Sequence, residues 1–151
     1  MEEKKHAKRN RNIILVAVII IVVALVLRTW YYRDYYLFKG LIQSDRFDAI
    51  IAEQILENPK FWTDEDGELK NILEGTKFKR TADNNVPELK EKDLMIKVHL
   101  KADSIHGSEK YNVIVSKEFG VTAYKKNEKA IELYIAQDCS ELLAWYDEHC
   151  E

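Results

Sequence analysis

Two cysteines, Cys139 and Cys150, are the first residues with chemistry to examine, because a thiol pair can form a disulfide or bind a metal ion. They stand eleven residues apart in the segment 138–150, which has the pattern of a helix. Eleven helical residues place both thiols on one face but about 16 Å apart. A disulfide requires Cα atoms within about 7 Å of each other. A straight helix therefore predicts two free thiols.

The two thiols are expected to differ in environment. Cys139 has core spacing with Leu142, Leu143 and Tyr146, so it is interpreted as a small buried apolar side chain. Cys150 is next to last in the sequence, so we expect it to be exposed. A bridge between two copies through Cys150 is one alternative, and an internal bridge across a helix that ends early is another.

The histidines and the acidic cluster at 63–68 are candidate metal ligands. A zinc site needs three or four ligands at short spacings, and only His149 and Cys150 are neighbours. The acidic segment TDEDGE lacks the twelve-residue frame of a calcium loop. Carboxylates at the start of a helix explain this segment, because they stabilise the positive end of the helix dipole. We therefore expect no metal and no cofactor.

Nucleophilic catalysis would need a histidine, a carboxylate and a hydroxyl in one cleft. His99 or His106 with Ser104 or Ser116 are the residues available for it. The chain contains no G-x-S-x-G, H-E-x-x-H or glycine-rich phosphate loop. No catalytic residue is therefore assigned, and a membrane-tethered hydrolase acting on envelope material is kept as the alternative function.

An apolar run at residues 13–27 is the strongest signal in the sequence. Its fifteen residues cover about 22 Å as a helix, and the flanking residues extend it toward the ~30 Å of a bilayer core. The tail before it, residues 1–12, holds five basic and two acidic residues. Basic residues stay in the cytoplasm, so we expect a cytoplasmic tail, a single membrane span over 13–32 and an extracytoplasmic remainder.

A cleavable signal peptide has the same basic start and apolar run, followed by small residues at the cleavage site. The positions after this run, 26–30, hold Val, Leu, Arg, Thr and Trp. The sequence therefore predicts that the helix stays attached as a signal anchor.

Residues that prefer the headgroup level of a bilayer follow the apolar run. Arginine can extend its guanidinium to the interface, and the rings of Trp and Tyr are apolar bodies with a polar tip. The residues expected at the membrane interface are Arg28, Trp30, Tyr31, Tyr32, Tyr35 and Tyr36. The alternative interpretation is an aromatic cluster in the core of the soluble domain.

The remainder of the chain is acidic. Once residues 1–12 and Arg28 are set aside, 17 basic and 24 acidic residues remain, about seven net negative charges. This balance argues against nucleic acid as a ligand. We expect the lipid bilayer and another membrane or envelope protein as partners, while the oligomeric state stays open. A composition rich in Lys, Glu, Ile and Asn, with few Gly and Pro, suggests an AT-rich bacterial genome. With the membrane anchor, this points to a bacterial cell envelope.

The periodicity of the remaining chain predicts an α+β fold: a transmembrane helix and then a small domain of order α-α-β-β-β-β-α. The anchor helix is expected to continue over 28–39 and end near Gly40, with a connector over 33–43 and the domain over 44–151. The expected elements are helices at 44–59, 63–75 and 138–150, a loop over most of 78–93, and strands at 94–102, 111–117, 121–125 and 130–136, which form a four-stranded antiparallel meander.

Function follows from this organisation as an expectation. An anchored domain without catalytic residues fits an extracytoplasmic interaction or accessory domain that binds a protein partner or a regulatory ligand. A short structural subunit whose helix packs on other membrane helices is a further alternative. The run holds only Ala17 and Ala24 as small residues, and these do not form the small-xxx-small pair that close helix packing uses.

Overall fold

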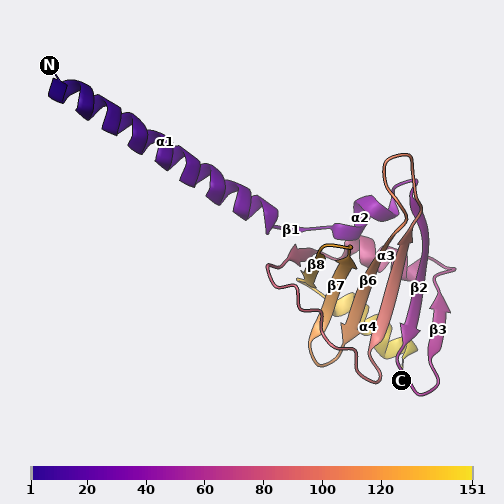
Figure 1. The fold of residues 1–151 in the computed structure, drawn as a ribbon. Helices are drawn as coiled ribbons and strands as arrows, with labels where there is room; N and C mark the ends of the chain where they lie inside the picture. The colour runs from indigo at the N-terminus through magenta and orange to yellow at the C-terminus, as the bar shows by residue number, and fades with distance from the viewer. Residues whose placement is uncertain (1, 151) are drawn as a thin grey trace. The chain divides into compact units, whose positions relative to one another are not determined.

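The structure is a computed structural model that describes residues 2–150. The chain forms two compact units, Met1–Arg33 and Asp34–Glu151. The elements are α1 (Glu2–Tyr31), β1 (Asp34–Tyr35), α2 (Leu37–Ile42), β2 (Phe47–Gln54), β3 (Lys60–Thr63), α3 (Glu68–Gly75), β4 (Phe78–Arg80), β5 (Leu94–Leu100), β6 (Glu109–Ser116), β7 (Gly120–Lys126), β8 (Ile131–Ala136) and α4 (Ser140–His149) (Figure 1). The fold is α+β, as expected.

The first unit is the helix α1. Its segment His6–Tyr31 is long and apolar enough to cross a membrane, as a membrane anchor or a signal sequence is. The side chains of the apolar run 13–27 are all exposed within the structure, and the larger ones show half of their surface or more. A helix that is apolar on every side has no polar face to present to water.

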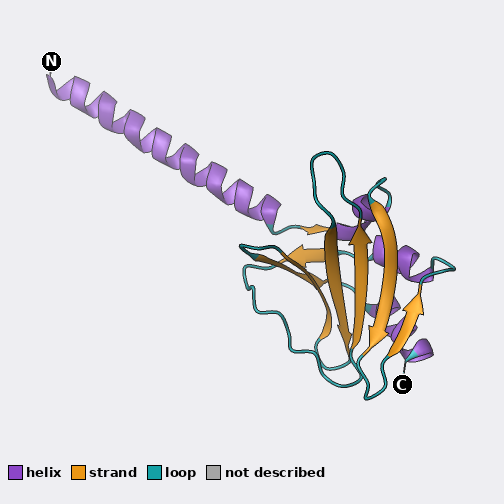
Figure 2. Ribbon diagram, turned by 45° about the vertical axis from the view of Figure 1, so that its right-hand side comes forward, coloured by secondary structure: helices purple, strands orange, loops and turns teal. Residues whose placement is uncertain are grey.

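The second unit is built on one antiparallel sheet. Within the described residues it has eight strands in the order β1-β4-β8-β7-β6-β5-β2-β3, of which β1 has two residues. The expected meander is confirmed as β5-β6-β7-β8 at its centre. Figures 1 and 2 show α2, α3 and α4 together on one face of this sheet. We call that side the covered face and the opposite side the open face.

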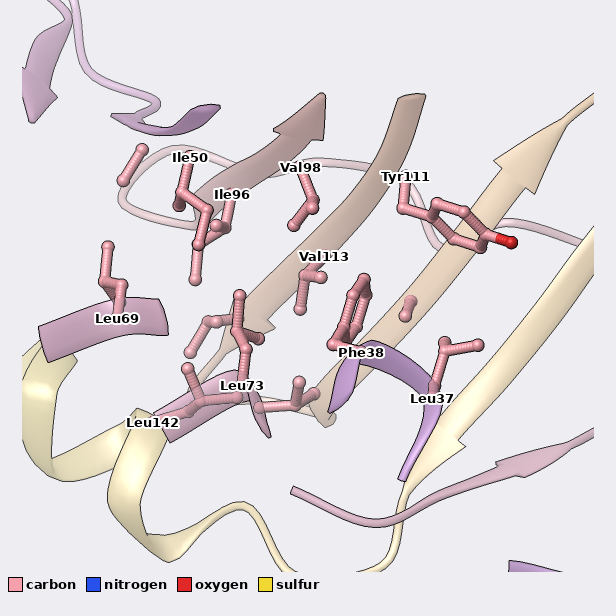
Figure 3. Close-up of a cluster of buried hydrophobic side chains, with 14 of the residues drawn as sticks. Leu37, Phe38, Ile50, Leu69, Leu73, Ile96, Val98, Tyr111, Val113 and Leu142 are labelled. Carbon is pink, nitrogen blue, oxygen red and sulfur yellow. The ribbon is translucent and has the colours of Figure 1, made fainter. Parts of the chain in front are cut away.

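The core lies between the covered face and the helices (Figure 3). The expected inward residues of β5 and β6 are all buried there, because alternate side chains of a strand share a face. Leu69, Leu73 and Leu142 come from α3 and α4 and are at most 1% exposed. Phe38 of α2 packs edge-on against Phe78, with 5.4 Å between the ring centroids.

The segment 44–59 is not a helix, and this prediction is wrong. Residues 47–54 form β2, which pairs on one side with β5 and on the other with β3. Ile50, Ala52 and Gln54 are buried at alternate positions, with a register shift near Phe47. The helical spacing of the isoleucines was coincidental, because pairing with two strands and burial outweigh the helix propensity of Ala, Glu and Gln.

The expected continuation of α1 to Lys39 is also wrong. The helix ends at Tyr31, and α2 begins separately at Leu37. Leu37, Phe38 and Ile42 are buried in the core, so the folded unit begins at Asp34 rather than at residue 44. The expected connector over 33–43 thus lies mostly inside the folded unit.

The expected helices at 63–75 and 138–150 are present as α3 and α4, with shorter bounds at their starts. The acidic cluster binds the start of α3 as predicted: the Asp64 carboxylate accepts hydrogen bonds from the N–H groups of Leu69 and Lys70 at 2.9 and 2.8 Å. These N–H groups have no partner inside the helix, and a carboxylate satisfies both their hydrogen bonds and the dipole. Residues 60–63 form the edge strand β3, so the expected helix does not begin at Thr63.

Candidate functional site

The six residues expected at a membrane interface fall into both units of the chain. Arg28, Trp30, Tyr31 and Tyr32 belong to the first unit, where the Trp30 ring lies 5.0 Å from the Arg33 guanidinium. The other two, Tyr35 and Tyr36, belong to the second unit.

Tyr35 and Tyr36 have different environments in the second unit. The Tyr35 ring is partly buried and lies edge-on to the Tyr134 ring, 6.1 Å away, so the alternative of a core aromatic cluster fits this residue. Tyr36 is exposed, with the ammonium groups of Lys39 and Lys77 within 6 Å of its ring.

Both cysteines are free and partly buried. Cys139 packs against the core, as expected, and immediately precedes α4. Cys150 also packs against the core, so the expectation that it is exposed is wrong. Burial raises the pKa of its thiol to about 11, because desolvation disfavours the thiolate.

Of the residues available for hydrolysis, Ser104 and His106 lie in the loop between β5 and β6, His99 lies in β5, and Ser116 lies in β6. His106 contacts Asp103, with 3.2 Å between Nδ1 and Oδ1, in the exposed loop between β5 and β6. Hydrogen bonds from the backbone N–H groups of His106 and Ile105 lower the pKa of Asp103 to about 2. Ser116 lies at the opposite end of β6, and its hydroxyl accepts the N–H of Glu118. Among the described residues no three His, Cys, Asp or Glu side chains are placed to share a metal ion.

The open face of the meander carries a groove of about 500 Å³. Strand register brings Lys97 of β5, Asn112 of β6 and Tyr124 of β7 into one row across it. The residues that line the groove are Met95, Lys97, Ser108, Glu109, Lys110, Asn112, Tyr124, Lys125, Lys126 and Asn127. Its size falls in the range of small-ligand sites, and most of its lining residues are polar or charged.

Asn112 is the unusual residue of this groove. It is only 7% exposed, yet its side-chain amide makes no hydrogen bond to any residue that the structure describes. Among the residues that the structure describes, every fully buried polar side-chain atom has a hydrogen-bond partner. The amide of Asn112 therefore keeps its residual exposed surface in the groove. Buried polar groups are normally hydrogen-bonded, so this amide has unmet capacity at the surface of a cavity.

Lysines dominate the charge of the groove. Two of the four are neutralised: Lys97 pairs with Glu53 at 2.9 Å, and Lys125 pairs with Glu109. The other two, Lys110 and Lys126, have no ion pair with any described residue. Because Tyr111 pairs with Lys125, these two lysines stand opposite each other in the next row.

The groove also contains Tyr124, whose hydroxyl makes no hydrogen bond to any described residue. Partial burial raises the pKa of Tyr124, and the charge of Lys97 opposes that shift. The hydroxyl stays protonated at neutral pH and makes no hydrogen bond within residues 2–150, so it is available as a donor to a ligand.

Sequence reasoning did not single out this groove. The sequence predicts the strand that contains Asn112, but it assigns a role only to the inward side chains of that strand. An available signal was one amide in an otherwise apolar strand, YNVIVS, with lysines on the strands beside it. Strand pairing decides which lysines meet, and that pairing follows from turns that the sequence alone locates only approximately.

No protein-family model, curated protein or solved structure matches this chain.

Proposed function

We propose that this protein is a single-pass membrane protein whose helix α1 anchors a non-catalytic interaction domain on the extracytoplasmic side, where the domain binds a membrane or envelope protein. The observation that carries the proposal is the apolar run 13–27, whose side chains are all exposed. Exposed apolar surface of this extent costs about 25 cal/mol per Å² in water, and a bilayer removes that cost.

Retention of the helix as an anchor is supported by the residues after the apolar run. Signal peptidase sites have small residues there, whereas α1 continues through Arg28 and Trp30 to Tyr31. The folded unit begins at Asp34, directly after these residues. The basic residues at 4–11 support a cytoplasmic N-terminus.

A binding role for the domain is supported by the open-face groove. Its ten lining residues include no histidine or cysteine. Its polar side chains without a partner among the described residues are those of Ser108, Lys110, Asn112, Tyr124, Lys126 and Asn127. Groups of this kind hold a ligand in place but supply neither a general base near neutral pH nor an activated nucleophile.

The proposal is tested by crosslinking in native membranes. A photo-reactive residue at an exposed position of the full chain should capture a specific protein, and a chain that carries α1 alone should not. Replacement of residues 13–27 by an unrelated apolar helix should preserve that capture. Absence of any protein enriched over the α1-only control would reject the interaction role.

Orientation is tested separately with a thiol reagent that does not cross membranes. Cys150 is a poor reporter because its pKa is raised, so Lys129→Cys in the exposed β7–β8 turn is used with Cys150→Ser. The reagent should label Lys129→Cys in intact cells and Lys8→Cys only after permeabilisation. The reverse pattern would place the domain in the cytoplasm.

A further inference from the structure

We propose that the open-face groove binds an extended acidic segment of the partner protein, with Lys110 and Lys126 at its carboxylates and Asn112 and Tyr124 at its backbone. This inference rests on the proposed function, because it takes the ligand to be a protein. It adds the site and the chemistry of the segment that the site recognises.

An anion between the two unpaired lysines would be stabilising. Lys110 and Lys126 face each other across β6 and β7, and like charges directly opposite in a sheet are destabilising. Glu109, the neighbour of Lys110 in β6, is already used: it contacts Lys125 and, at 3.1 Å, Arg46. A carboxylate from outside the domain would therefore remove a repulsion that the domain itself leaves uncompensated.

The uncharged hydrogen-bonding groups of the groove match the donors and acceptors of a peptide backbone. Asn112 offers both an N–H₂ donor and a carbonyl acceptor to a ligand in the groove. A peptide backbone supplies both C=O and N–H groups to meet them. Sulfate and the internal groups of polyphosphate supply acceptors only, so they would leave the Asn112 carbonyl unmet.

Spacing agrees with an extended segment. Side chains two residues apart on an extended peptide are about 6.8 Å apart on one side. Lys110 and Lys126 lie on neighbouring strands, about 4.8 Å apart at the backbone, and their flexible stems cover the difference. Two acidic residues at positions i and i+2 can therefore each meet one ammonium group.

The charge distribution of the domain directs an acidic segment to this face. The domain as a whole is acidic, whereas the groove has four lysines against one glutamate. The segments at the helices carry much of the opposite charge, in Asp64, Glu65, Asp66, Glu68, Glu74, Glu141, Asp147 and Glu148. An acidic ligand is thus repelled by the helix layer and attracted by the open face.

The test measures peptide binding to the full chain in nanodiscs of phosphatidylcholine, a lipid without net charge. The probe is a fluorescent peptide of alternating Glu and Ser, and its controls are the Gln and Ser counterpart and inorganic polyphosphate. We expect anisotropy to report binding of the acidic peptide that weakens with added salt. Lys110→Glu with Lys126→Glu should weaken it at least about tenfold.

Two further variants separate a site from general attraction between charges. Lys39→Glu with Lys77→Glu makes the same change of charge away from the groove, at two exposed lysines beside Tyr36, and should change affinity less than about twofold. Asn112→Ala removes an amide that has no partner in the domain, so it should weaken binding about five- to tenfold while the Tm stays unchanged.

Each other outcome overturns the inference. Equal losses in the two double variants would mean attraction without a site. Binding of polyphosphate without binding of the peptide would assign the groove to phosphate. Crosslinking that captures a partner equally in the wild type and in Lys110→Glu/Lys126→Glu would leave the proposed function standing and reject the groove as its site.

Discussion

The two faces of one sheet differ in how their buried residues are satisfied. On the covered face, Ile96, Val98 and Val113 meet only apolar side chains from the strands and helices. On the open face, burial is almost as deep, since Ile114 is fully buried and Asn112 is 7% exposed, but no helix of the folded unit lies there. The same strands thus support a closed apolar core on one side and a polar groove on the other.

This difference separates stability from recognition. Apolar burial on the covered face is complete within the domain, so a substitution there should change the free energy of unfolding. The polar groups in the centre of the open face have unmet hydrogen bonds, so a substitution there should change binding and leave folding nearly unaffected. Four substitutions, in decreasing order of expected effect, test this division.

The largest effect is expected for Val98→Asp. Val98 is fully buried on the covered face, and an unpaired carboxylate there costs several kcal/mol, comparable to the whole stability of a small domain. We expect loss of the folded state by circular dichroism of the full chain in detergent.

The matched open-face variant is Lys97→Met, which loses a partly exposed ion pair with Glu53. It should lower the free energy of unfolding by about 1 kcal/mol or less. Equal unfolding of both variants would contradict the division.

The contrast between neighbours such as Val98 and Lys97 was visible in the sequence, because strict alternation in β5 and β6 predicts both the strands and their inner face. In β8 the alternation of Ile131, Leu133 and Ile135 is present, but these residues lie on the open side and Tyr134 is in the core. Both sets are apolar, so the pattern alone does not decide between the faces.

Other parts of the fold were not predictable for physical reasons. In β2, isoleucines occur at both helical and strand spacing, and only the pairing with β3 and β5 resolves the ambiguity. The groove depends on Lys110 and Lys126 meeting across two strands, which is a property of register. Asn112 looks like an ordinary outward residue until its burial and its lack of a hydrogen bond are known.

The next largest effect is expected for Phe38→Ala, at a position that the sequence had assigned to a connector. Phe38 is fully buried on the covered face and packs edge-on against Phe78 and Tyr111. Truncation of a buried Phe costs about 3–5 kcal/mol through lost burial and the cavity left behind. Urea denaturation should show this loss, whereas Tyr36→Ala, at an exposed neighbour, should stay within about 0.5 kcal/mol. If Phe38→Ala left the free energy of unfolding unchanged, the folded domain would instead begin near residue 44.

An intermediate, pH-dependent effect is expected for Glu109→Gln at the edge of the groove. The hydrogen bond and charge of Lys125, together with Arg46, lower the pKa of Glu109 below its ordinary value of 4.5. A carboxyl whose pKa is lowered by folding stabilises the fold above its unfolded pKa, and that contribution is lost as the pH falls through the folded pKa. The variant should therefore be less stable than the wild type by about 1–2 kcal/mol at pH 7.

The measurement is urea denaturation of both chains from neutral pH downward. The difference in the free energy of unfolding should shrink as the pH falls below 4.5 and through the lowered pKa of Glu109. A difference that stays constant across this range would mean that the glutamate acts by packing rather than by charge.

The smallest effect on stability, and the clearest on reactivity, is expected at Cys150. This thiol packs against the core behind the covered face, and burial raises its pKa from 9.0 to about 11. Two units of pKa lower the thiolate fraction about 100-fold at neutral pH, and the thiolate is the reactive species. In a Cys139→Ala background, alkylation of Cys150 should therefore be about 100-fold slower than alkylation of Lys110→Cys on the open face. The two rates should converge once urea unfolds the domain.

Cys150→Ser should change the free energy of unfolding by about 1 kcal/mol or less, because the thiol is only half-buried. Alkylation of native Cys150 as fast as at Lys110→Cys would show that the end of α4 is open to solvent. The apolar core on the covered face would then not be closed at this end.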